Sequence, residues 1–309
     1  AAVERAKARV VKVRTVVEKN EDLNISLRDA EDLSNKTADE LTTLEGTLTS
    51  ALSAAQEAQT AAGDDIPAGQ TVDETATAAV ERAKARVVKV RTVVEKNEDL
   101  NISLRDAEDL SNKTADELTT LEGTLTSALS AAQEAQTAAG DDIPAGQTVD
   151  ETATAAVERA KARVVKVRTV VEKNEDLNIS LRDAEDLSNK TADELTTLEG
   201  TLTSALSAAQ EAQTAAGDDI PAGQTVDETA TAAVERAKAR VVKVRTVVEK
   251  NEDLNISLRD AEDLSNKTAD ELTTLEGTLT SALSAAQEAQ TAAGDDIPAG
   301  QTVDETATA

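Results

Sequence analysis

Apolar residues recur at helical spacing along the chain, and residues 71–147 show the pattern in full. In the first stretch they stand three or four residues apart and fall on one stripe: Val72, Ala76, Val80, Ala83, Val87, Val90 and Val94. This spacing is typical of an amphipathic α-helix that buries one face. It predicts a helix over residues 71–96. A β-strand at residues 87–94, which are rich in valine, is the less favoured alternative because the stripe continues through them.

Two further helices are expected after this one. Asn97-Glu98-Asp99 indicates a break and a new N-terminus, and a short second helix should follow with Leu100, Leu104, Ala107 and Leu110 buried. The third and longest stripe alternates spacings of three and four, as heptad a and d positions do: Leu118, Leu121, Leu125, Ala128, Ala132, Ala135 and Ala139. We expect this third helix to end at Gly140.

Helix starts and a linker separate these stripes. Thr71-Val72-Asp73-Glu74 and Thr114-Ala115-Asp116-Glu117 both have the spacing of a capping box. The linker Gly140 to Gln147 contains Gly140, which suits a left-handed helix end, and Pro144, which lacks the amide that a continuous helix needs. Ile143 is its only large apolar residue, and we expect it to insert between helix ends.

The whole pattern repeats without substitution every 77 residues, so the chain is a tandem array. Repeat 1 covers residues 1–70 and lacks the start of its first helix. Repeats 2, 3 and 4 cover 71–147, 148–224 and 225–301, and residues 302–309 begin a further repeat. The frame suggests a piece of a longer array.

The predicted fold class is all-α: identical three-helix units with long, short and long helices, staggered as up-down-up bundles and joined end to end into an elongated rod. Each unit would add about 40–60 Å. The alanine-rich half of the third helix should be covered by the first helix of the next unit. Basic residues on the first helix, from Arg82 to Lys96, should face the acidic third helix.

Composition removes several kinds of chemistry. The chain has no His, Cys, Met, Phe, Tyr or Trp, and its net charge is −28. Imidazole and thiolate catalysis are therefore impossible, and binding to nucleic acid or anionic lipid is disfavoured. No apolar run approaches the ~20 residues of a membrane span.

Four kinds of motif could form a site, and each also has a simpler interpretation. The basic run Arg82 to Lys96 could bind polyanions, but a solvated helix face is favoured. Asp141-Asp142 with Asp150-Glu151 could bind calcium, but lacks the EF-hand ladder, and helix capping is favoured.

The acid pairs Glu108-Asp109 and Asp116-Glu117 could supply a general acid and base, but the sequence shows no sign of a cleft around them. Asn101-Ile102-Ser103 and Asn112-Lys113-Thr114 are glycosylation sequons, taken as incidental. We therefore predict no enzyme, with no catalytic, cofactor-binding or metal-binding residue and no cofactor.

Exact acidic helical copies, with the helix starts at Thr71 and Thr114 and the linker Gly140 to Gln147, resemble the repeat regions of Gram-positive cell-wall-anchored surface proteins. The resemblance implies an extracellular stalk on the cell surface, anchored through segments outside this sequence, whose length is set by copy number. Multivalent binding of host extracellular proteins and an engineered concatemer are the alternatives. Expected partners are neighbouring repeats; a monomer is favoured, with a coiled-coil dimer as the variant.

Overall fold

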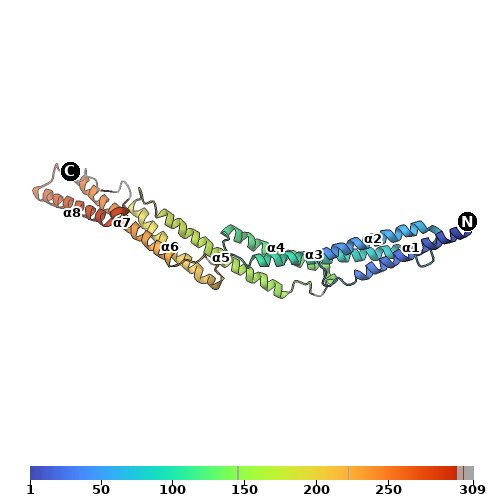
Figure 1. Ribbon diagram of the computed structural model, residues 1–309. Helices are drawn as coiled ribbons and strands as arrows, with labels where there is room; N and C mark the ends of the chain where they lie inside the picture. The colour runs from blue at the N-terminus through green and yellow to red at the C-terminus, as the bar shows by residue number, and fades with distance from the viewer. Residues whose placement is uncertain (145, 222, 298–301, 303–309) are drawn as a thin grey trace. The chain divides into compact units, whose positions relative to one another are not determined.

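The computed structural model describes residues 1–144, 146–221, 223–297 and 302, and every regular element in that part of the chain is helical (Figure 1). The predictions of an all-α fold and of a helical repeat array are therefore confirmed. Apart from Thr302, the expected start of a further repeat at 302–309 lies outside the described residues.

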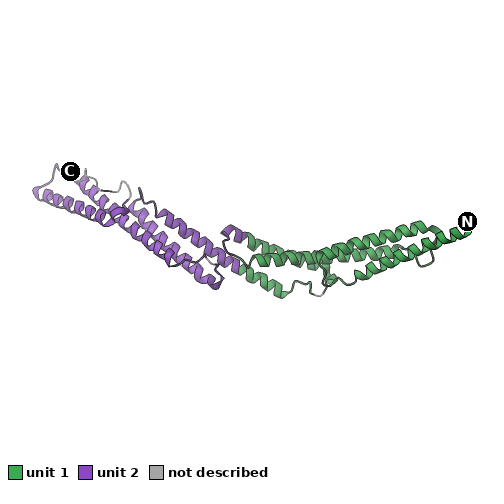
Figure 2. Cartoon of the chain, viewed as in Figure 1, with its two compact units in different colours: residues 1–109, 120–162 green, residues 110–119, 163–309 purple. Residues whose placement is uncertain are grey.

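Each copy contributes one long α-helix, one shorter α-helix and a 3₁₀ turn. The elements are α1 (Ala2–Asp29), α2 (Ala38–Ala62), η1 (Gly63–Asp65), α3 (Glu74–Asp106), α4 (Ala115–Ala139), η2 (Gly140–Asp142), α5 (Glu151–Asp183), α6 (Ala192–Ala216), η3 (Gly217–Asp219), α7 (Glu228–Asp260), α8 (Ala269–Ala293) and η4 (Gly294–Asp296). They form two compact units, unit 1 with residues 1–109 and 120–162, and unit 2 with residues 110–119 and 163–309 (Figure 2).

The predicted break at Asn97-Glu98-Asp99 is wrong, because α3 runs through it as one helix of 33 residues. Asn, Glu and Asp inside a helix each cost less than about 0.7 kcal/mol relative to Ala, whereas a new helix needs a costly nucleus. Asn97 also stands four residues after Val93 and three before Leu100, so it occupies the buried stripe itself. The expected first and second helices of a unit are therefore a single helix.

The start of this helix also differs from the prediction. Asp73, not Thr71, caps α3, with its side chain accepting a hydrogen bond from the Ala76 amide at 2.9 Å. The Val72 amide is already held by the side-chain oxygen of Gln59 at 2.6 Å, which keeps the chain before Asp73 out of the helix. The second predicted capping box is confirmed: the Thr114 hydroxyl accepts from the Glu117 amide, and the Glu117 carboxylate accepts from the Thr114 amide.

A three-helix core is present in unit 1, but its third helix comes from the next repeat. Leu23 of α1, Leu41 and Leu48 of α2, and Val80 and Val87 of α3 belong to one buried cluster. The predicted bundle of three helices within a single repeat is therefore corrected: the C-terminal half of α1, most of α2 and the N-terminal half of α3 pack together. Unit 2 repeats this cluster with α5, α6 and α7.

The alanine-rich half of the shorter helix is covered partly by the next repeat, as predicted, and at its end by its own repeat. In unit 1, Ala55 of α2 lies in the cluster that contains Val80 and Val87 of α3, and Ala51 packs against it. Ala135 and Ala139 of α4 pack with Val93 of α3, and Ile143 of the linker closes the same cluster. Only this last part departs from the prediction of cover by the next repeat, because α3 is longer than predicted and packs along the end of α4. Ile143 therefore packs against the end of α4 and the middle of α3.

Candidate functional site: the joint between repeats

The joint is a groove that receives the N-terminal half of the following helix. Val80 and Val87 of α3 are completely buried there, beside Leu23, Leu33 and Leu41 of repeat 1. In unit 2, Val234 and Val241 of α7 are buried in the same way. Fully burying a valine contributes roughly 1.5–3 kcal/mol, so two such residues make each joint a substantial apolar contact.

Arg86 joins the end of one repeat to the next. Its Nη1 donates to the carbonyl oxygens of Ala30 and Glu31, at 3.1 and 3.0 Å, immediately after α1 ends. Carbonyl groups at a helix C-terminus lack partners inside the helix and attract positive charge. The Asp142 carboxylate pairs with the same Arg86 side chain, 3.7 Å from its Nε. Asp142 also lies 3.0 Å from the Lys89 Nζ. Arg240 makes the same two carbonyl contacts in unit 2.

The Arg86 contact also gives the register of one repeat on the next. Arg86 has the repeat position of Arg9, and Ala30 lies 21 residues after Arg9. Because α1 and α3 both run antiparallel to α2, one copy advances by about 21 helical residues, or ~32 Å. This advance in unit 1 is smaller than the expected 40–60 Å, since the long helices of adjacent copies overlap.

A partly buried ion pair fixes the same register. The Arg91 Nη1 lies 2.6 Å from the Glu45 Oε2, and both side chains are less than one third exposed. Arg245 and Glu199 form the equivalent pair at 2.6 Å in unit 2. The basic run Arg82 to Lys96 is thus partly committed to acids of its own and of the preceding repeat.

The linker is held at two points by side chains from the helices. The Asn97 amide nitrogen donates to the Gln147 carbonyl at 2.7 Å, and the Gln136 side-chain oxygen accepts from the Val149 amide at 2.7 Å. Within the linker, the Gln147 amide bonds back to the Pro144 carbonyl. The chain between α4 and α5 therefore has specific anchors, although its described residues after Asp142 are not helical until Glu151.

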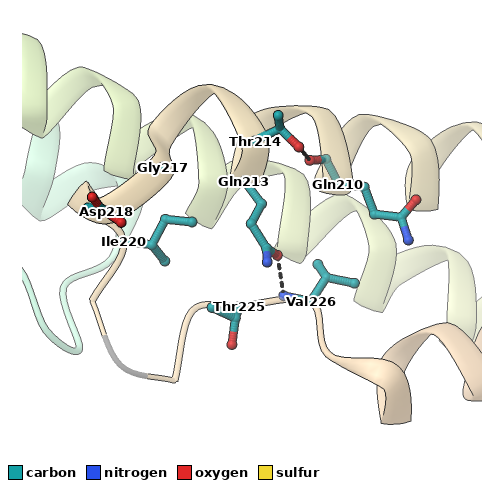
Figure 3. A pocket seen from close by; sticks show the side chains of 8 residues that line it. All are labelled: Gln210, Gln213, Thr214, Gly217, Asp218, Ile220, Thr225 and Val226. Atoms are coloured by element: carbon teal, nitrogen blue, oxygen red, sulfur yellow. Dashed lines mark hydrogen bonds between the residues drawn. The ribbon is translucent and has the colours of Figure 1, made fainter.

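Figure 3 shows the corresponding linker of unit 2, where the Gln213 side chain bonds to the Val226 amide and Ile220 lies against the end of α6. A shallow hollow opens there between α6 and the linker. Its lining residues are Gln210, Gln213, Thr214, Gly217, Asp218, Ile220, Thr225 and Val226. Asp218 is the only ionisable residue among them, so this hollow offers no acid–base pair.

Two of the four acids considered for calcium, Asp142 and Asp150, have structural partners. Asp142 pairs with Lys89, and Asp150 caps α5 by accepting from the Ala153 amide at 2.9 Å. Among the described residues, no three potential metal ligands of the Asp, Glu, His or Cys type come together. Asp150 is therefore a helix cap, as the favoured interpretation has it.

The candidate acid pairs do not gather into a cleft. Glu117 is committed to its capping box, and hydrogen bonds from the Thr114 amide and hydroxyl lower the pKa of Glu117. A lowered pKa is the opposite of what a general acid requires at neutral pH. Glu108 and Asp109 are exposed after the end of α3. The sequon residues are exposed as well, Asn101 within α3 and Asn112 in the turn before α4.

Sequence reasoning missed the clamp made by Asn97 and Gln136. The available signal was a polar residue on an apolar stripe: Asn97 lies between Val93 and Leu100 at helical spacing, which points to a buried polar contact.

A comparison with protein-family models, curated proteins and solved structures found no match to this chain. No helix in the described part of the chain is both long and apolar enough to cross a bilayer.

Proposed function

We propose that this chain is a non-catalytic structural repeat region, an elongated stalk of a surface protein that projects a functional domain, with its length set by copy number. One observation carries the proposal: α3 in unit 1 and α7 in unit 2 each belong to two consecutive cores. The N-terminal half of α3 packs with α1 and α2, and its middle packs with α4. A helix shared in this way makes a joint as stiff as the helix itself.

The polar contacts at the joint support the same function. Arg86 and Arg91 tie α3 to the preceding repeat, while Asn97 and Gln136 hold the following linker. Bending at a joint would break several of these contacts together. Such a joint suits a spacer, whose task is to keep a distance under thermal and mechanical load.

Placement at the outside of a cell, anchored through segments beyond this sequence, rests on the resemblance to Gram-positive surface-protein repeats. The absence of Cys fits a rod that needs no disulfide. The same resemblance implies that the stalk carries an adhesive domain.

A second function, multivalent binding of an extracellular protein, is favoured by one feature. Ile25, Ile102, Ile179 and Ile256 are each 46–48% exposed, so every copy presents the same isolated apolar side chain. Identical weak sites on one chain gain affinity through effective concentration. The chain lacks the aromatic residues that dominate most binding hot spots, which makes this the second choice.

Small-angle scattering on arrays of two, four and six copies tests the spacer. The maximum dimension should grow by a constant ~32 Å per copy, as the register of α1 and α3 gives. Growth with the square root of copy number would mean flexible joints and would count against a spacer. Dilution series extrapolated to zero concentration remove any contribution from association.

Two matched variants sharpen this experiment. Val87→Asp, Val164→Asp and Val241→Asp together place a charge in the groove of every joint, and the constant increment should then be lost. Ile102→Asp, Ile179→Asp and Ile256→Asp change exposed residues outside the groove and should leave the increment unchanged. An increment that both triple variants retain would show that the groove does not set the spacing.

A further inference from the structure

A second groove lies beside the buried contact of a joint, and we call it the side groove. In unit 1 it is open to solvent between the end of α1 and the N-terminal half of α3, with Leu27, Ala79 and Ala83 among its apolar lining residues. In unit 2 the equivalent residues of α5 and α7 line the same groove. Both grooves have a volume of 580 Å³, within the ~300–1,000 Å³ typical of ligand sites. The side groove is therefore a feature of the repeat and not of one copy.

Three basic side chains of α3 line the side groove at helical spacing: Arg82, Arg86 and Lys89. Two of them are occupied, since Arg86 binds carbonyl groups of repeat 1 and both Arg86 and Lys89 pair with Asp142. The Arg82 side chain is exposed and has neither an ion pair nor a hydrogen bond with another described residue. Arg236, at the same position of unit 2, also lines its groove without such a partner.

An arginine without an acid partner is unexpected in this chain, which has 60 acidic and only 32 basic residues. Farther along α3, Lys84, Arg91 and Lys96 each pair with a carboxylate. The guanidinium of Arg82 keeps all its N–H donors available, and a guanidinium binds a carboxylate through two parallel hydrogen bonds. The side groove thus combines an apolar floor with a free group that recognises carboxylates.

We propose that the side groove binds an extended peptide segment of a partner protein, in which one acidic side chain is flanked by apolar side chains. The carboxylate pairs with Arg82, and the apolar side chains cover Leu27, Ala79 and Ala83. The lining residues of α3 extend from Ala79 to Lys89, about 15 Å of helix. This length matches four or five residues of an extended chain at ~3.3 Å each, which favours a peptide as the ligand.

The acids of the side groove select against densely charged polymers. Glu31 and Asp142 line it together with the three bases, so the groove carries only a small positive balance. Heparin or nucleic acid would bring many further anions beside these carboxylates and beside a chain of net charge −28. A segment with a single carboxylate satisfies Arg82 without that repulsion.

This binding role goes beyond the spacer and does not depend on it. Arg82 makes none of the contacts that hold the joint, and the side groove is lined by none of the exposed isoleucines. An array that binds no peptide can still grow by a constant increment in scattering, so the two proposals fail separately. Identical side grooves on one chain would raise the affinity for a partner with several such segments.

Nuclear magnetic resonance of a short peptide mixed with the full chain tests the proposal. The probe is a capped pentapeptide with glutamate at its centre, a leucine on each side and a serine at each end. Its leucine methyl signals should broaden on binding to the much larger chain. The same peptide with a central glutamine should bind about 10-fold more weakly, because it lacks the charge.

Two results with these probes would overturn the proposal. One is a glutamate peptide that does not bind at about 10 mM, ten times the concentration at which a weak complex of ~1 mM affinity is half formed. The other is displacement of the bound peptide by a heparin fragment, which would show that the side groove attracts any anion.

Two sets of arginine variants locate the carboxylate. The first set removes the free cation from the side groove and should weaken binding about 10-fold or more: Arg82→Gln, Arg159→Gln and Arg236→Gln. The matched control makes the same change of charge at exposed arginines near the ends of the long helices: Arg105→Gln, Arg182→Gln and Arg259→Gln. The control should bind like the parent. Equal affinity in the two sets would refute the role of Arg82.

Two sets of alanine variants locate the apolar part of the ligand. The first set fills the floor and leaves Arg82 in place: Ala79→Leu, Ala156→Leu and Ala233→Leu. The control changes the preceding residue, which is exposed and does not line the side groove: Ala78→Leu, Ala155→Leu and Ala232→Leu. Only the first set should lose binding, and circular dichroism should show equal helix content and melting in both. A first set that binds like the parent would place the peptide elsewhere.

Discussion

Val10 and Val87 are the same residue of the repeat in two different surroundings. Val10 faces solvent and Val87 lies in the groove of repeat 1, although the residues around them in sequence are identical. A difference between the same substitution at these two positions therefore isolates the contact with the preceding repeat. Intrinsic helix propensity, which is equal at both, cancels.

We predict that Val87→Ala destabilises α3 by about 2 kcal/mol, because it removes two buried methyl groups and leaves a cavity. Val10→Ala should change stability by less than about 0.5 kcal/mol. Hydrogen exchange of the substituted peptide, which its mass distinguishes from the other copies, should be about 30-fold faster only for Val87→Ala, a factor that corresponds to 2 kcal/mol. Equal acceleration in both variants would argue against the groove.

The glutamates of the capping boxes make stability depend on pH at the residue scale. Hydrogen bonds from the threonine amide and hydroxyl lower the pKa of Glu40, Glu117, Glu194 and Glu271. A lowered folded-state pKa means that the stabilisation is fully present above the unfolded pKa of about 4.3 and is lost as pH falls through the folded value.

Replacing all four glutamates by glutamine should therefore lower the melting temperature at pH 7, and this effect should shrink as the pH falls below about 4.3 and the parent carboxylates take up protons. The difference between parent and variant at each pH is the quantity to measure, since it removes the effect of the chain's overall charge. A difference that stays constant from pH 7 to pH 3 would show that the caps act without their charge.

At the scale of elements, the continuity of α3 can be tested with proline. Glu98→Pro lies in the interior of a continuous helix and should cost about 3 kcal/mol or more, because it removes a hydrogen bond and clashes with the preceding turn. If a second helix began at Asn97, proline at the next position would be tolerated.

Glu74→Pro is the matched control for this prediction. Glu74 is the first residue of α3, after the cap Asp73, where proline removes no helical hydrogen bond. Urea unfolding followed by circular dichroism should separate the two variants clearly. Similar midpoints for both would restore the helix break that the sequence suggested.

The same elements show how far the sequence alone reaches. The buried stripes were predicted correctly, since residues such as Val87, Leu110 and Leu125 are buried, and helical spacing is a local property. The continuity of α3 through Asn97 was not predicted. A polar residue can be a helix cap or a buried hydrogen-bond donor, and only the position of Gln147 in the folded chain shows which of the two Asn97 is.

The candidate site was only partly predictable for a related reason. Ile143, the charge complementarity and the box at Thr114 could be expected from local pattern. The sequence could not predict which copy supplies the third helix of a core. Identical copies have identical patterns, and the choice depends on tertiary contacts. The box at Thr71 failed because Gln59 holds the Val72 amide, a contact between residues distant in sequence.

For the whole molecule, stability should depend on the number of copies. Each joint buries apolar residues of two adjacent copies, such as Leu41 and Val87, and an array has one joint fewer than it has copies, so longer arrays have more joints per copy. Repeat arrays of this kind behave as a sum of unit and nearest-neighbour terms. We predict that the melting temperature rises from two to four to eight copies by decreasing increments.

Thermal unfolding of the three arrays at equal mass concentration checks this. Melting at several protein concentrations is the control, because any contribution from association would change with concentration. Melting temperatures that do not change with copy number would mean that each copy folds independently, and the joint would then contribute little.

Because the joints are identical, the length of the array can change by whole repeats during evolution. Removing any 77 consecutive residues from the interior leaves a chain in which each remaining side chain meets the neighbours it had before, as the matching joints of the two units indicate. Misaligned recombination between repeated coding segments makes deletions of this kind. The number of repeats in the protein could therefore rise or fall in a single recombination event, and no compensating mutation would be needed.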